Sequence, residues 1–147
     1  MDEHELDRYL HERIPLSRAM EIEVRAASRA GVEIYAPLAP NINHRDTVFG
    51  GSASAVAILA AWSALHVCMR AENIDARLVI RRNTMSYERP IAAGFTATAA
   101  PPDAESWAKL VGTLRRGRPA RVRVGARLEC AGLVVGELHG EFAVLPT

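Results

Sequence analysis

One stretch in the middle of the chain constrains the fold more than any other feature. From Ser52 to about Asn73 the sequence reads as a single helix that is apolar almost all round and rich in alanine. A helix without a polar face is buried on most of its sides. Its most apolar part, Ala53–Met69, contains Ser63 and His66 and falls short of a bilayer span. We therefore expect a buried core helix and no membrane segment.

Segments on both sides of this helix alternate between apolar and polar residues, which is the period of half-buried strands. Strands are expected over Met20–Ala26, Val32–Ala36, Arg77–Glu88, Ala93–Ala99, Ala120–Cys130 and Leu133–Leu145. Two shorter helices are expected, one over residues 2–13 before Pro15 and one between an Asp103 N-cap and Gly117. Strands and helices do not alternate as they do in parallel sheets. The pattern predicts an α+β fold in which an antiparallel sheet of five to six strands wraps around one long central helix.

Length and composition fit a single folded domain over residues 1–147. Hydrophobic residues make up 49% of the chain and charged residues 24%, proportions that exclude a disordered protein. The two cysteines, Cys68 and Cys130, are too isolated for a disulfide scaffold or a metal site. The acidic N-terminus is the opposite of a signal peptide, so we expect a cytoplasmic protein. No metal or other cofactor is expected.

The formal charge of +1 hides a basic segment. Residues 77–127 carry 11 basic and 3 acidic side chains, a net charge of +8. Such a segment suits nucleic acid, a membrane surface or an acidic protein or ligand, and it can also be a solvated strand face. Aromatic residues make up only 5%, and no nucleic-acid motif accompanies the arginines. We therefore expect neither nucleic acid nor a membrane as a partner.

A polar loop and a glycine pair precede the central helix. The loop reads Ala36-Pro37-Leu38-Ala39-Pro40-Asn41-Ile42-Asn43-His44, and the helix opens with Thr47-Val48-Phe49-Gly50-Gly51-Ser52. Together with the order of the strands, these segments resemble the hotdog fold of acyl-thioester enzymes, and more narrowly the YiiD C-terminal-type putative thioesterase domain. The resemblance covers nearly the whole chain. Some relatives of that group act as malonyl-acyl-carrier-protein decarboxylases.

The resemblance implies a homodimer, or a dimer of dimers, with a pantetheine tunnel and the active site between subunits. The partner is an acyl carrier protein or a CoA thioester, and the pantetheine thioester is substrate and not cofactor. The thioester carbonyl lies at the N-terminus of the central helix, where the first N–H groups lack partners and the glycines lack bulk. The expected substrate-binding residues are Thr47, Phe49, Gly50, Gly51 and Ser52.

The helix lacks the acid and base that many hotdog thioesterases use. Those enzymes carry a His before the glycine pair and an Asp or Glu about two turns into the helix. Here Phe49 takes the place of the His, and no Asp or Glu occurs from Thr47 to Ala71. A general base contributes about 10²- to 10⁴-fold to a rate, so its absence argues against efficient hydrolysis. Asp46 or Glu88 could still approach from outside the helix.

Amide and imidazole groups remain in the loop. An Asn NH₂ group donates well to an oxyanion, so we expect Asn43 to be the oxyanion donor, with Asn41 and His44 as further catalytic residues. The alternative is that the asparagines form turns and His44 is a solvated loop residue. This set favours decarboxylation of malonyl-acyl carrier protein to acetyl-acyl carrier protein, an initiating step of fatty acid biosynthesis, because no water must be activated. Acyl-thioester hydrolysis and non-catalytic acyl-thioester binding are the alternatives.

Other polar side chains carry two further predictions. Arg81, Arg82, Arg121 and Arg123 are expected to dock an acidic carrier protein or the phosphates of CoA. A solvated strand face is the alternative for these arginines. His66, deep in the apolar helix, is expected to be a satisfied core or interface histidine.

Overall fold

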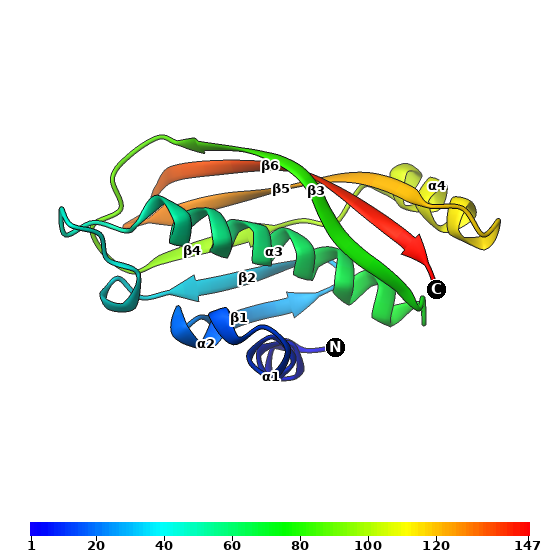
Figure 1. The fold of residues 1–147 in the computed structure, drawn as a ribbon, viewed down its shortest axis with the longest axis horizontal. Helices are drawn as coiled ribbons and strands as arrows, with labels where there is room; N and C mark the ends of the chain where they lie inside the picture. Colours follow the sequence, from blue (N-terminus) through cyan, green and yellow to red (C-terminus); the bar gives the residue numbers. More distant parts are fainter.

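A six-stranded antiparallel sheet curls around one long helix (Figure 1). The computed structural model describes residues 1–147. The strands lie in the order β1-β2-β4-β5-β6-β3, and each neighbouring pair is antiparallel. The elements are α1 (Glu3–Arg13), α2 (Pro15–Ala19), β1 (Glu23–Ser28), β2 (Gly31–Ala36), the 3₁₀ turn η1 (Ala39–Asn41), α3 (Gly50–Ala71), β3 (Ala76–Tyr87), β4 (Phe95–Ala99), α4 (Ala104–Arg115), β5 (Ala120–Cys130) and β6 (Leu133–Pro146). The prediction of an antiparallel sheet around one central helix is confirmed.

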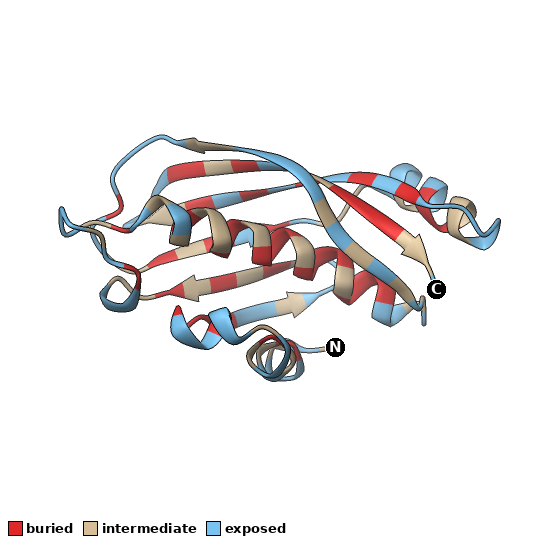
Figure 2. Ribbon diagram, in the orientation of Figure 1, coloured by how far each residue is buried: buried red, intermediate tan, exposed pale blue.

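Helix α3 lies in the concave side of the sheet, where its apolar surface is removed from water. Figure 2 shows buried residues along α3 and along the strands that face it. By length and composition α3 could cross a membrane, which corrects the expectation that this stretch is too short. However, 67% of its most apolar window is buried inside the chain. The helix begins at Gly50 rather than Ser52 and ends before Asn73, whose φ is +54°.

The N-terminal segment differs most from the prediction. Asp2 caps α1 by accepting a hydrogen bond from the Glu5 N–H, and Pro15 begins a second helix in addition to ending the first. A turn follows in which Glu21 has a φ of +53°, so β1 begins at Glu23 and not at Met20. The apolar alternation that predicted the strand therefore spans a turn and a strand.

Most other boundaries agree with the prediction to within one or two residues. Strand β5 is buried at alternate residues as expected. Asp103 caps α4 through the Ser106 N–H, a hydrogen bond that holds the pKa of this carboxyl below its usual value. Gly117 follows α4 with a φ of +72°, which is the expected glycine stop. Strand β4 begins at Phe95 and not at Ala93, because its partner β2 ends opposite this residue.

The two edges of the sheet are unlike. Helix α1 covers β1, and the Asp7 carboxylate accepts the Val24 N–H at 2.9 Å. At the other edge β3 pairs only with β6, and no element of the chain covers its outer side. This strand is 12 residues long, with a bulge between Ile80 and Arg82. A long uncovered edge strand is a template for pairing with another strand.

Candidate functional site

The N-terminus of α3 presents backbone donors without partners. The N–H groups of Gly50, Gly51 and Ser52 make no hydrogen bond within the chain, and Phe49 at the N-cap supplies no side-chain acceptor. Such groups carry partial positive charge along the helix axis. The first turn contains no acidic residue. This helix start can hold an oxygen that carries or develops negative charge.

Two exposed aromatic rings flank these donors. Phe49 is 58% exposed and Tyr87 is 59% exposed. A Cβ on Gly51 would lie 2.3 Å from the Phe49 ring, so that ring covers the glycine. The Tyr87 hydroxyl donates to the Gly50 carbonyl at 3.3 Å, and a Cβ on Gly50 would meet the Tyr87 ring at an ordinary 3.5 Å. Sequence reasoning missed Tyr87, because it lies at the far end of a strand that follows the helix.

Asn41 fixes the loop that leads into α3. It is 2% exposed, and its Nδ2 donates to the carbonyls of Met20 and Pro37 at 3.0 and 2.8 Å. Its Oδ1 is buried and has no partner. Its backbone carbonyl accepts the Phe49 N–H at 2.7 Å. Both side-chain hydrogens are therefore in use, and the predicted catalytic role of Asn41 has no free donor in this structure.

Asn43 uses its side chain inside the same loop. Its Nδ2 donates to the Thr47 Oγ1 at 2.9 Å and to the Val48 carbonyl at 3.3 Å. Its Oδ1 accepts the N–H groups of Arg45 and Thr47. This arrangement is the turn-forming alternative. To act as an oxyanion donor Asn43 would have to release one of these bonds, so that role stays a prediction.

His44 and the two candidate carboxylates are exposed to solvent. A bridge between Ile42 and Val48 closes the loop, which leaves His44 and Asp46 at its tip. Glu88 follows β3 and is also exposed. An exposed carboxylate keeps its water shell, so neither acid provides a buried general base over the glycine pair in the single chain.

A half-exposed stripe of α3 leads from the glycine pair to a separate hollow. The stripe consists of Ala55, Ile58, Trp62 and His66. It ends in a cavity of about 630 Å³ between α1, α3 and β3. His66 lies in the cavity wall, and its Nε2 is buried without a partner. Within the single chain His66 is therefore not a satisfied core histidine, because aromatic rings and not polar groups pack against the imidazole, and its role as an interface histidine stays a prediction.

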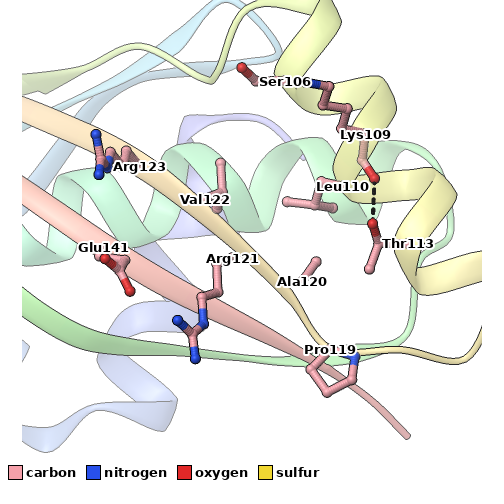
Figure 3. A pocket seen from close by; sticks show the side chains of 10 residues that line it. All are labelled: Ser106, Lys109, Leu110, Thr113, Pro119, Ala120, Arg121, Val122, Arg123 and Glu141. Atoms are coloured by element: carbon pink, nitrogen blue, oxygen red, sulfur yellow. Dashed lines mark hydrogen bonds between the residues drawn. The ribbon is translucent and has the colours of Figure 1, made fainter.

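The predicted docking arginines lie on the face of the sheet that points away from α3. Arg121 and Arg123 are exposed and alternate with buried residues of β5. Glu141 stands opposite both Arg82 and Arg123 in register and pairs with Arg81 at 2.5 Å. Figure 3 shows Arg121, Arg123 and Glu141 around a hollow of about 600 Å³ beside α4. Figure 1 shows α4, which lines this hollow, at the opposite end of the molecule from the start of α3, so one chain does not bring the hollow and the helix start together.

Comparisons with known proteins agree with this architecture. The family model described as putative thioesterase (yiiD_Cterm) matches residues 3–146. A putative thioesterase from Shewanella oneidensis superposes with a TM-score of 0.88 and 27% identity, over 98% of this chain and 97% of that one. A protein of unknown function from Chlorobaculum tepidum TLS superposes with a TM-score of 0.93 and 25% identity, over 99% of this chain and 94% of that one.

A third structure supports the fold alone. It is a protein from Pseudomonas aeruginosa described as a probable thioesterase, with a TM-score of 0.83 and 21% identity over 98% of this chain and 96% of that one. Since the family model and the superposed structures share this architecture over nearly the whole chain, the predicted hotdog fold is confirmed.

Proposed function

The chain belongs to the YiiD C-terminal family of putative thioesterases, and from that premise we propose that it decarboxylates malonyl-acyl carrier protein at the N-terminus of α3. The product is acetyl-acyl carrier protein. One observation carries this proposal: the free N–H groups at the helix start stand beside helical turns that hold no acid or base between Gly50 and Leu65. Such a site can stabilise an oxyanion, but within the single chain it has no group that activates water.

Decarboxylation of a malonyl thioester requires hydrogen-bond donors to the thioester oxygen, and the start of α3 provides them. The bond between the malonyl carboxylate carbon and the methylene carbon breaks, and carbon dioxide leaves. The electron pair of that bond moves toward the thioester and forms an enolate, whose oxygen the N–H groups of Gly50 and Gly51 stabilise. One such donor contributes roughly 2.7–4 kcal/mol to a transition state. A proton from water or from His44 then completes the acetyl group.

The aromatic residues around the glycine pair support the same chemistry. Apolar surroundings raise the free energy of the carboxylate relative to neutral carbon dioxide. Phe49 covers Gly51, and Tyr87 contacts Gly50. Both rings are more than half exposed in the single chain, so a bound thioester can reach them.

Hydrolysis of acyl thioesters is the second candidate, and the family description favours it. Hydrolysis needs an activated water or a carboxylate nucleophile. The nearest acid in sequence, Asp46, is exposed at the loop tip. Hydrolysis would therefore require Asp46 or Glu88 to approach the site in an assembled dimer. Binding of thioesters without turnover is the third outcome that an assay distinguishes.

We further propose that two chains pair through β3 and that the site is completed between them. The outer edge of this strand is uncovered over 12 residues, and Val79 in it is 44% exposed. None of the main hollows of the single chain includes the glycine pair. A second copy paired along the β3 edge would enclose the glycine pair on its open side. In such a dimer Phe49 and Tyr87 lie near the interface between the two chains.

The same pairing supports carrier docking on the arginine face. When two copies of β3 pair antiparallel, a two-fold axis relates the two chains. The partner's strands and its α3 therefore run in the opposite direction to those of this chain. The start of the partner's α3 then lies at the end of this chain that holds α4, Arg121 and Arg123. An acidic carrier protein bound at these arginines would present its pantetheine arm toward the partner's helix start.

A product assay tests the proposed function. The protein is incubated with malonyl-carrier protein and, separately, with malonyl-CoA, and the thioester products are separated by mass. We expect acetyl thioester and carbon dioxide in equal amounts. Free carrier thiol without acetyl product would overturn decarboxylation and establish hydrolysis. Binding without either product would overturn both activities.

A further inference from the structure

The cavity at the far end of α3 contains a histidine that the proposed chemistry does not use. Its lining combines apolar and aromatic side chains with a few charged ones: Tyr9, Trp62, His66, Arg70, Asp75 and Arg77. It lies where α1, the second half of α3 and the start of β3 meet. At about 630 Å³ it has room for an acyl group and part of a pantetheine arm.

The imidazole of His66 is held in a fixed orientation. Its ring centroid lies 4.7 Å from that of Tyr9 and 4.6 Å from that of Trp62, and these two centroids are 6.3 Å apart, so the three rings form one aromatic cluster. Trp62 is itself fixed, because its Nε1 donates to the Leu78 carbonyl at 3.0 Å. Two rings packed against the imidazole restrict its rotation, so its nitrogens keep a defined direction.

Neither ring nitrogen of His66 has a partner in the chain, and only Nε2 is sealed from solvent. A buried acceptor without a partner is less costly than a buried N–H without one. We therefore assign the proton to Nδ1, which leaves Nδ1–H as a free donor. Burial, with a smaller contribution from the charge of Arg70, lowers the pKa of His66 to about 4, so the ring is neutral at physiological pH.

The proposed dimer brings this donor to the other subunit's thioester site. The Tyr87 end of β3 contacts Gly50, whereas the Ala76 end lines the His66 cavity. Antiparallel pairing of two β3 strands sets the partner's Tyr87 end beside this chain's Ala76 end. The partner's glycine pair therefore faces the His66 cavity.

We propose that His66 is a catalytic residue supplied across the dimer, whose Nδ1–H donates to the acyl group held by the partner's Gly50 and Gly51. This inference rests on the proposed function and on the β3 dimer. It makes each site depend on backbone groups of one subunit and on a side chain of the other. The half-exposed stripe of Ala55, Ile58 and Trp62 then forms part of the wall between the two.

Mixed dimers test whether His66 acts across the interface. In one chain Gly50→Pro removes a backbone donor, and in the other His66→Phe keeps a ring in the stack but removes both nitrogens. We expect each variant alone to lose roughly 10²-fold or more in kcat/KM, as for the loss of an oxyanion donor. Random re-association of equal amounts should restore about a quarter of wild-type activity, because half of the dimers then hold one intact site. No restoration would mean that His66 and the glycine pair act within one chain, and would overturn the inference.

Chemical cross-linking separates this inference from the activity. Phe49→Cys and His66→Cys are made in separate chains that also carry Cys130→Ser, and the mixture is treated with a short bis-maleimide. Residues 49 and 66 of one chain are about 26 Å apart along the helix, so a cross-link between them must join two chains. We expect a covalent dimer only when both variants are present. If no covalent dimer forms, the inference is overturned even if the protein turns over thioesters. If the covalent dimer forms but the protein turns over no thioester, the proposed function and the acyl contact of His66 are overturned together.

Discussion

Replacing His66 by phenylalanine should weaken the dependence of stability on pH between pH 6.5 and 4. Burial and the nearby Arg70 lower the pKa of His66 from 6.5 to about 4. Above pH 6.5 the imidazole is neutral in both the folded and the unfolded chain. At lower pH the unfolded chain binds a proton that the folded chain does not, so the wild-type protein loses stability as the pH falls through this window.

The size of the effect follows from the two pKa values. At about 1.4 kcal/mol per pH unit, the difference between the two pKa values corresponds to a loss of at most about 3 kcal/mol in the free energy of unfolding. His66 is only half-buried, so solvent screening reduces the expected loss to about 1–2 kcal/mol. Arg70, Asp75 and Arg77 line the same cavity, and Arg13 lies 6.0 Å from the Tyr9 ring centre. These groups are present in both proteins, so their contributions largely cancel in the difference.

The assay is urea unfolding of both proteins at a series of pH values from 7.5 to 4.5, at one protein concentration. We expect the wild-type free energy of unfolding to fall by about 1–2 kcal/mol more than that of the His66→Phe variant. Parallel curves would refute the assignment of His66 as a buried neutral imidazole.

Three further predictions concern other parts of the molecule. Asn41→Ala leaves two backbone carbonyls without their donor, so we expect a loss of about 2–3 kcal/mol in the free energy of unfolding; an unchanged urea midpoint would contradict this role. Val79→Asp puts a charge on the exposed β3 edge, so light scattering should show a shift from dimer to monomer, and an unchanged dimer would exclude this edge. The double variant Arg121→Glu with Arg123→Glu should raise KM for malonyl-carrier protein far more than KM for a short pantetheine analogue. Equal effects on both substrates would contradict a docking role and leave the two arginines as part of a solvated strand face.

The sequence predicts the core of the fold well, because burial leaves a periodic pattern. Strand β5 alternates over its whole length, and α3 is apolar on nearly every side. The N-terminal turn is not predictable in this way. Met20 and Ile22 are buried like strand residues, but Glu21 between them has a positive φ, so the apolar spacing coincides with a turn.

The glycine pair could be predicted, because a helix start is a local feature and the loop before it resembles a known family. The roles of Asn43 and His66 depend on distant or detailed contacts instead. The sequence does not distinguish an amide that faces a substrate from one that makes hydrogen bonds within its own turn, as Asn43 does. The stack around His66 needs Tyr9, which lies on another helix.

The backbone N–H of Gly50 provides the most direct test of a thioester oxygen bound at the start of α3. Proline suits the first position of a helix, and Phe49 before it already has an extended ψ of 131°. A Cβ at residue 50 makes only ordinary contact with Tyr87. Gly50→Pro therefore removes the donor, and Gly50→Ala is the matched control that adds a Cβ and keeps it.

The measurement is kcat for malonyl-carrier decarboxylation by the two variants, with thermal unfolding recorded for both. We predict that Gly50→Ala stays within a few-fold of wild type and that Gly50→Pro falls by roughly 10²- to 10³-fold with its fold intact. Equal turnover by the folded proline and alanine variants would contradict an oxyanion site at this helix start.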